Sequence, residues 1–167
     1  MNLAQFYIES LNLEKHPEGG YFKETYRDQG QIPETALPDG FDGPRSFSTS
    51  IYFLLPGEEI SAFHRIKSDE IWHYHTGAAI RIHVIDPDGN YATLLVGKDP
   101  GNNEAFQQVV PAGCWFAAEC TDPRSFSLAG CTVAPGFDFI DFELPNRQTL
   151  VDLFPQHQTI IERFTSQ

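Results

Sequence analysis

The sequence has few basic residues. Its 11 Lys and Arg residues stand against 23 Asp and Glu residues in a chain of 167, so the formal net charge at pH 7 is −12. A surface of that sign repels nucleic acid and anionic lipid, which excludes both as expected partners. A local gathering of arginines keeps an anionic small molecule open as a ligand, and the candidates for it are Arg45, Arg65, Arg81 and Arg124.

Cysteines and long apolar runs are also scarce. The three cysteines, Cys114, Cys120 and Cys131, form no CxxC and cannot all pair, which favours a reducing compartment over a disulfide framework. The first residues lack the basic region and apolar run of a signal peptide. No segment approaches the ~18 apolar residues that span a membrane. We therefore expect a cytoplasmic protein that makes no membrane contact.

Turn-forming residues, by contrast, are abundant. Thirteen Gly and twelve Pro in a chain with 13% aromatic residues favour many short strands over long helices. The length fits one domain, which we place at residues 1–167.

The pattern along the chain predicts mostly strands. A helix is expected over 2–14 with Asn2 as its N-cap, then a strand at 21–27 and a Pro/Gly-rich loop at 28–44. Turn signals separate the later apolar stretches, and two short helices are expected in the C-terminal tail. The later strands are expected at 46–55, 59–66, 70–77, 79–85, 91–97, 105–110, 114–119, 125–133 and 137–144. This count and spacing predict an all-β sandwich or barrel.

Two short motifs carry a family resemblance. The spacing His64-x-Ile66-x3-Glu70-x6-Gly77 resembles the first motif of the cupin superfamily, with Ile66 where that motif has a second histidine. In the second motif, Pro-x-Gly-x2-His-x3-Asn, the sequence keeps Pro111 and Gly113 and places Phe116 at the histidine.

Longer stretches resemble one branch, the RmlC-like cupins that contain a domain of unknown function. The stretches are 16–27, 46–55, 61–77 and 131–144. The resemblance implies a cupin double-stranded β-helix, or jelly roll, with short terminal helices. It also implies a homodimer, for which the strand at 21–27 is our candidate for crossing to the partner.

The resemblance places Glu70 inside the barrel, and alternation along a strand then turns Trp72 and Tyr74 inward and His73 and His75 outward. A cupin metal takes three histidines and a glutamate, of which only His64 and Glu70 remain. A β-bulge that rotates His73 or His75 inward would restore a donor. We expect no metal and no other cofactor.

The metal-free epimerases of the same fold use a His–acid pair and a tyrosine. By analogy His64 would be the base, Glu70 its partner, and Tyr74 or Tyr52 the acid, for proton abstraction next to a carbonyl. The remaining candidates would contact the ligand: Trp72, Phe116, Tyr52, His73, His75 and Tyr21.

The sequence therefore favours binding of a small polar metabolite, such as a sugar or sugar nucleotide, with metal-independent epimerase or isomerase activity as one outcome. Two alternatives stay open, a ligand-binding module without catalysis and a metal-dependent cupin enzyme such as a dioxygenase. A structural interpretation also stands, in which His64 and Glu70 form a satisfied buried contact and the aromatic residues fill the core.

Overall fold

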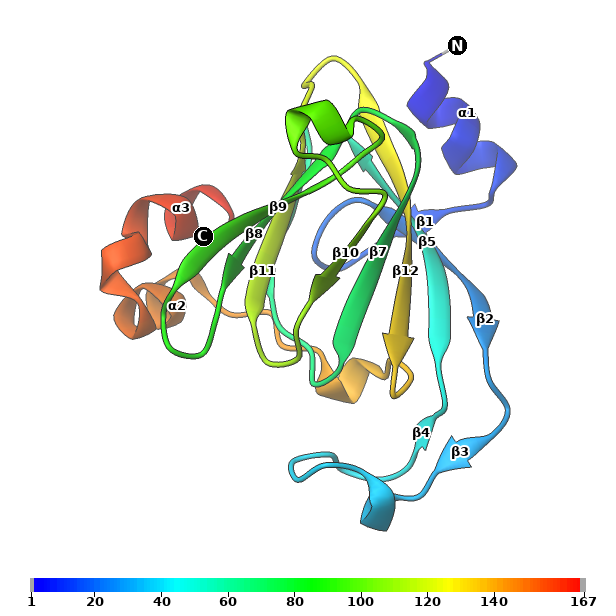
Figure 1. Cartoon of the computed structure of the whole chain (residues 1–167), viewed down its shortest axis with the longest axis vertical. Helices are drawn as coiled ribbons and strands as arrows, with labels where there is room; N and C mark the ends of the chain where they lie inside the picture. Colours follow the sequence, from blue (N-terminus) through cyan, green and yellow to red (C-terminus); the bar gives the residue numbers. More distant parts are fainter. Residues whose placement is uncertain (1, 166–167) are drawn as a thin grey trace.

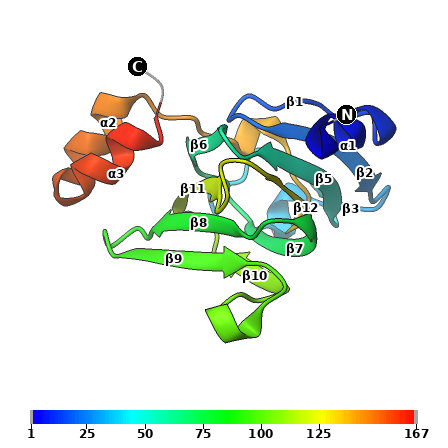
Figure 2. The same cartoon turned by 90° about the horizontal axis from the view of Figure 1, so that it is seen from above.

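A computed structural model describes residues 2–165, and its core is built from two antiparallel sheets that pack face to face (Figures 1 and 2). The larger sheet has the strand order β1-β2-β5-β12-β7-β10 and the smaller β6-β11-β8-β9. Side chains of both sheets meet in one apolar cluster, which includes Phe53 and Trp72 from the larger sheet and Ile82 and Phe116 from the smaller. This is the jelly roll that the sequence predicted.

The strands are short, as the frequent turns require. The larger sheet holds β1 (Glu14–Lys15), β2 (Tyr21–Arg27), β5 (Thr49–Pro56), β7 (Asp69–Gly77), β10 (Gln107–Val110) and β12 (Phe126–Ala134). The smaller sheet holds β6 (Ile60–His64), β8 (Ile80–Ile85), β9 (Tyr91–Val96) and β11 (Trp115–Cys120). A separate pair, β3 (Gln31–Ile32) and β4 (Arg45–Ser46), extends below the barrel in Figure 1.

Helices cover the two outer faces. The helix α1 (Leu3–Ser10) begins where the Asn2 side chain accepts a hydrogen bond from the Ala4 amide, and it packs on the larger sheet through Ala4. The helices α2 (Arg147–Leu153) and α3 (Gln158–Arg163) lie at the opposite side in both views, packed on the smaller sheet (Figures 1 and 2). No helix within residues 2–165 has the length and apolar character needed to cross a membrane.

Three of the predicted segments differ from the structure. The helix predicted over 2–14 ends at Ser10, and Glu14 begins β1. Residues 137–144 do not form a strand but a loop with a 3₁₀ turn, η3 (Phe139–Asp141), because the Asp138 side chain caps the Ile140 amide. The strand-like pairing of this segment is limited, within residues 2–165, to an isolated bridge between Glu143 and Arg65. The predicted loop 28–44 contains β3 and a second 3₁₀ turn, η1 (Glu34–Ala36).

Candidate functional site

A cavity of about 240 Å³ opens between the sheets at the end of the barrel that the 137–142 loop covers. Its apolar and aromatic lining consists of Phe22, Ile51, Phe53, Ile66, Trp72, Cys131, Val133, Phe137, Phe139 and Phe142. Its polar lining consists of His16, Glu18, Glu24, Arg27, Thr49, His64, Glu70 and Asp138. An apolar pocket with a few convergent polar groups is the usual form of a small-molecule site.

His64 is the last residue of β6, and both of its ring nitrogens are engaged. Nε2 lies 2.9 Å from Oε2 of Glu18, and Nδ1 lies 2.8 Å from the Ala62 carbonyl oxygen. Because both neighbours are acceptors, the contacts favour the doubly protonated ring. Burial lowers the pKa of His64, but the Glu18 carboxylate outweighs burial and raises that pKa above its ordinary value.

Glu18 is the carboxylate partner of His64, a place that the sequence analysis assigned to Glu70. Burial acts to raise the pKa of Glu18, yet the charge and hydrogen bond of His64 hold it below the ordinary value. The Ser61 hydroxyl donates a further hydrogen bond at 2.9 Å. Each group therefore favours the charged form of the other, Glu18 the protonated imidazole and His64 the carboxylate.

A glycine turn brings Glu18 to this position. Gly19 has φ +108°, and a Cβ there would collide with the carbonyl oxygen of Ile60. The close approach lets the Ala62 amide donate to the Glu18 carbonyl at 2.7 Å, which docks the turn on β6. The glycines of this segment predict a turn whose side chains could lie at the pocket rim, but no pattern in the sequence predicts that Glu18 reaches His64.

His16 begins the same turn and lines the cavity. Its Nδ1 lies 3.4 Å from Glu18 Oε2, and its ring stacks on Phe139 with centroids 6.0 Å apart. Burial lowers the pKa of His16, which the Glu18 carboxylate only partly offsets. Burial therefore favours the neutral form of His16, whereas Glu18 favours the charged form of His64.

Glu70 lies on β7 in the interior of the cavity. Burial raises its pKa to about 7, and the Glu18 carboxylate adds to this rise, whereas His64 and a hydrogen bond with Cys131 oppose it. Burial and the Glu70 charge raise the pKa of Cys131 well above its ordinary value, so Cys131 remains a thiol. A carboxyl group with a pKa near 7 can both accept and donate a proton at neutral pH.

Trp72, two residues further along β7, has an unsatisfied donor. It lines the cavity and is almost fully buried. Its indole N–H finds no acceptor among residues 2–165. A buried polar group without a partner is costly, so an acceptor atom of a ligand in the cavity would be stabilising.

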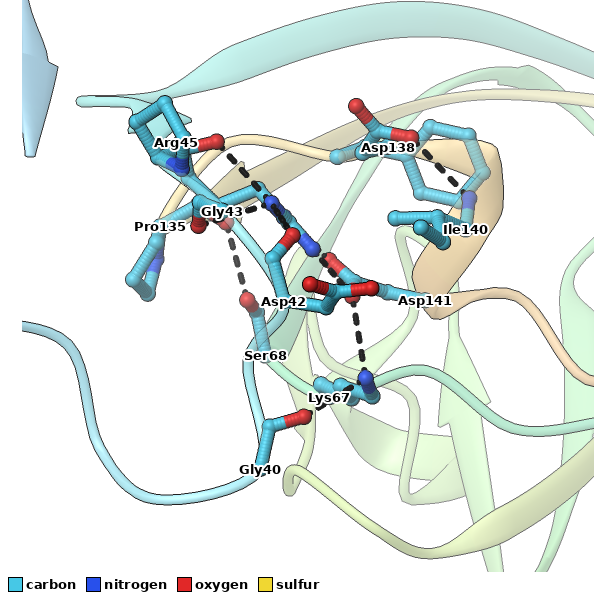
Figure 3. A network of polar contacts seen from close by, with 12 residues as sticks. Gly40, Asp42, Gly43, Arg45, Lys67, Ser68, Pro135, Asp138, Ile140 and Asp141 are labelled. Atoms are coloured by element: carbon cyan, nitrogen blue, oxygen red, sulfur yellow. Dashed lines mark hydrogen bonds and ion pairs between the residues drawn. The ribbon is translucent and has the colours of Figure 1, made fainter. Parts of the chain in front are cut away.

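An ion-pair network fixes the loop that covers the cavity (Figure 3). The guanidinium of Arg45 donates to both carboxylate oxygens of Asp141 at 2.7 Å, with both side chains buried. Lys67 lies 3.4 Å from the same carboxylate and donates to the Gly40 carbonyl at 2.7 Å. Three segments distant in sequence thereby meet at Asp141, directly after the residues that line the cavity mouth.

The residues at the cupin metal positions do not fit a metal ion. Both nitrogens of His64 are already engaged, and its ring packs on Phe116 with centroids 4.0 Å apart. Ile66 and Phe116 offer no donor atom. Within residues 2–165, no three His, Cys, Asp or Glu side chains are grouped to hold a metal.

Several predicted site residues lie outside the cavity lining. Phe116 does not line the cavity and packs on the His64 ring. The Tyr74 hydroxyl donates to the Gly77 carbonyl at 2.7 Å, so the predicted acid is already engaged. Tyr21 and Tyr52 pack in the cluster under α1.

The two outward histidines stay outward. Strand β7 does contain a register shift against β12, between Tyr74 and Thr76. Even so, His75 packs against Tyr52, and His73 contacts Thr132 at 3.0 Å, so neither lines the cavity.

Comparison with known proteins shows which family the chain matches. The family model described as Cupin superfamily (DUF985) matches residues 5–145. The uncharacterized protein YML079W of Saccharomyces cerevisiae is 36% identical over 143 residues, which cover 80% of this chain and 71% of that protein. A hypothetical protein from Leishmania major has a TM-score of 0.88 at 35% identity, covering 98% of this chain and 99% of its own.

Two further solved structures are similar to this chain, one at higher and one at lower sequence identity. Protein SO0799 from Shewanella oneidensis has a TM-score of 0.86 at 37% identity, covering 99% of this chain and 98% of its own. A variant of oxalate decarboxylase from Bacillus subtilis has a TM-score of 0.54 at 16% identity over 90% of this chain and 36% of its own, a likeness of fold alone. The family match and the jelly-roll topology agree, and the chain belongs to the DUF985 family of the cupin superfamily.

Proposed function

We propose that this protein binds a small polar metabolite of sugar size in the barrel cavity and interconverts it by metal-independent proton transfer. The observation that supports this best is Glu70, a carboxyl group in the cavity interior with a pKa of about 7. Catalytic acids and bases work best when their pKa lies near the working pH. The reaction class is isomerisation next to a carbonyl, because epimerisation at one carbon would need a second acid on the opposite face of the enolate.

The proton balance closes within the cavity. Ionised Glu70 takes the proton from the carbon beside the substrate carbonyl, and the C–H electron pair forms the carbon–carbon double bond of an enolate. The Trp72 N–H, which lacks an acceptor among residues 2–165, is the candidate donor to the developing oxyanion. Glu70 then delivers the proton to the former carbonyl carbon while the hydroxyl proton of the first carbon moves to the enolate oxygen, so an aldose and a ketose interconvert and no oxidant or reductant is needed. This scheme does not use Tyr74.

The cavity size limits the ligand. Sites for drug-sized ligands occupy about 300 to 1,000 Å³, and this cavity measures about 240 Å³. A single small sugar or a short carbonyl compound fits that volume. The nucleotide part of a sugar nucleotide would have to lie outside the mouth, beside Glu24 and Asp138, where like charges repel its phosphates.

Deuterium exchange in heavy water tests the proposal. Wild-type protein is incubated with glyceraldehyde, dihydroxyacetone, erythrose or xylose, and loss of the proton beside the carbonyl is followed by proton NMR. We expect exchange with wild type and with Glu143→Gln, a carboxylate outside the cavity, and none with Glu70→Gln. Equal exchange rates in wild type, in Glu70→Gln and in buffer would overturn the reaction for this substrate class.

A second candidate is a binding module without catalysis. It is favoured by the packing of His64 against Phe116 and Phe142, whose centroids lie 4.0 and 5.5 Å from its own. A ring packed on two aromatic rings and engaged at both nitrogens suits a structural pair. Ligand binding by calorimetry without deuterium exchange would select this candidate.

The cellular setting follows from the same features. The three cysteines are unpaired and buried, which supports a reducing compartment such as the cytoplasm. A homodimer is supported by β2, which pairs with β1 only at Tyr21 and Phe22 and so leaves the edge at 23–27 open to a second strand within the described residues.

A further inference from the structure

We propose that the cavity selects a small ligand with a positive charge, such as an amino sugar or another aminocarbonyl compound, through an aromatic cage and two carboxyl groups. This inference rests on the proposed function for the site and narrows its substrate class. It is carried by the arrangement of three phenylalanine rings at the mouth and by the way the charges of the lining are paired.

The cage consists of Phe137, Phe139 and Phe142, all from the loop after β12. Their ring centroids lie 4.9 to 6.4 Å apart, and their planes are inclined by 71 to 82° to one another. The three rings pack edge to face, and the His16 ring stacks on Phe139 and lies edge-on to Phe142, while the Phe139 ring remains exposed at the mouth. Ring faces carry partial negative charge and attract ammonium groups.

The basic groups of the cavity are already neutralised. Arg27 pairs with Glu24 at 2.8 Å and gives another hydrogen bond to the Phe137 carbonyl. His64 pairs with Glu18 at 2.9 Å. No positive charge of the lining is left for an anionic ligand.

Two carboxyl groups of the lining have no such partner. Neither Glu70, inside, nor Asp138, at the mouth, forms an ion pair with another residue of 2–165. Asp138 uses one carboxylate oxygen to cap Ile140, and it precedes a cage residue in the chain. The cavity thus offers counter-charges to a cation and repels carboxylates and phosphates.

Calorimetry with three probes of one shape tests the inference. The probes are choline, its neutral isostere with a tert-butyl group in place of trimethylammonium, and the tert-butylacetate anion. We expect choline to bind at least about tenfold more tightly than the isostere, the order that a desolvated cation–π contact gives. The anion should bind most weakly.

Variants at the exposed mouth test whether the aromatic cage and Asp138 cause the preference for choline. Phe139→Leu and Asp138→Asn should each weaken choline binding about fivefold or more while changing isostere binding less than about twofold. Because both side chains are exposed, the fold should survive, and thermal melts verify it. Glu143→Gln, in the same loop but outside the lining, is the matched control and should leave all three affinities unchanged.

The outcomes separate this inference from the proposed function. Equal affinity for choline and the isostere, or tighter binding of the anion, overturns selection by charge even if sugars exchange deuterium. If choline is preferred but Phe139→Leu and Asp138→Asn have no effect, the cage is wrong. Binding of choline with the expected variant effects supports the inference even where the deuterium experiment fails.

Discussion

Glu18 and Glu70 are two buried carboxyl groups in one cavity, and their pKa values move in opposite directions. Glu18 pairs with His64 and accepts a hydrogen bond from the Ser61 hydroxyl, so its pKa falls. Glu70 has only the Cys131 thiol as a hydrogen-bond partner and faces the Glu18 charge, so its pKa rises to about 7. When the pKa values of two neighbouring acids are shifted in opposite directions, one acid keeps a fixed charge and the other can exchange a proton at neutral pH.

The free energy of unfolding should depend on pH because the pKa of Glu70 is raised. The folded-state pKa of about 7 exceeds the ordinary 4.5, so the folded protein holds this proton more tightly than the unfolded chain. The stabilisation is full below pH 4.5 and is lost as pH rises through 7. Glu70→Gln mimics the protonated form, so its unfolding free energy minus that of wild type should rise by roughly 2 to 3 kcal/mol between pH 5 and 8. A pH-independent difference in denaturant titrations contradicts this assignment.

The His64–Glu18 pair should behave as a coupled unit. His64→Ala or Glu18→Gln strands a buried charge, and each should lower the unfolding free energy by about 3 to 5 kcal/mol. The double variant should lose less than the sum by more than about 1 kcal/mol. His73→Ala, outside the cavity, should cost under about 1 kcal/mol, the scale of one ordinary hydrogen bond. Additive losses would mean that the two side chains do not interact.

Sequence spacing identified His64, Glu70 and Trp72 but not Glu18. The family resemblance placed Glu70 inside the barrel, and strand alternation, a rule of local geometry, then turned Trp72 inward; both side chains line the cavity. The Glu18 contact joins a loop to a strand 46 residues later, and only the docking of the Gly19 turn on β6 creates it. Tyr74 was a candidate acid because alternation turned it inward. Alternation could not reveal that its hydroxyl donates a hydrogen bond to the nearby Gly77 carbonyl.

At the scale of elements, the loop at 137–142 combines cage, cavity lining and anchor. Its apolar and acidic residues follow each other much as they do in a half-buried strand, which is why the sequence predicted a strand here. The Asp138 cap and the Asp141 ion pair with Arg45 impose a 3₁₀ turn instead. The second of these is a contact across 96 residues, which no local pattern contains.

The anchor predicts a local response to mutation. Asp141→Asn leaves the buried Arg45 without its counter-charge and should lower stability by about 3 to 5 kcal/mol. Amide exchange at 137–142 should accelerate because the loop loses its attachment. Glu143→Gln breaks only the half-exposed pair with Arg65 and should cost under about 1 kcal/mol. Unchanged amide exchange in Asp141→Asn would show that the ion pair does not hold the loop.

The whole molecule was largely predictable. The jelly roll, the helix after Asn2 and the strand at 21–27 follow from patterns of turns and alternation that are local and repeated. The family match over residues 5–145 confirms the resemblance first seen in the His64–Gly77 motif. The site could be located from this fold, whereas its pairing and charge required the three-dimensional contacts.

Assembly is the prediction at this scale. We expect a homodimer in solution, because the open edge of β2 at 23–27 favours pairing with another strand. Light scattering at micromolar concentration should give twice the chain mass of 18.8 kDa. Thr25→Pro, which removes an edge amide, should shift the protein towards monomer. A monomer at all concentrations would refute the dimer.

The account depends above all on the protonation of Glu70. Carbon-13 NMR of its side-chain carboxyl, assigned by comparison with Glu70→Gln, measures this directly across pH 4 to 9. The account predicts a midpoint of about 7, shifted from the ordinary 4.5 by burial and by Glu18. A midpoint near 4.5 would contradict it, because Glu70 would then be a fixed charge and not a proton-transfer group.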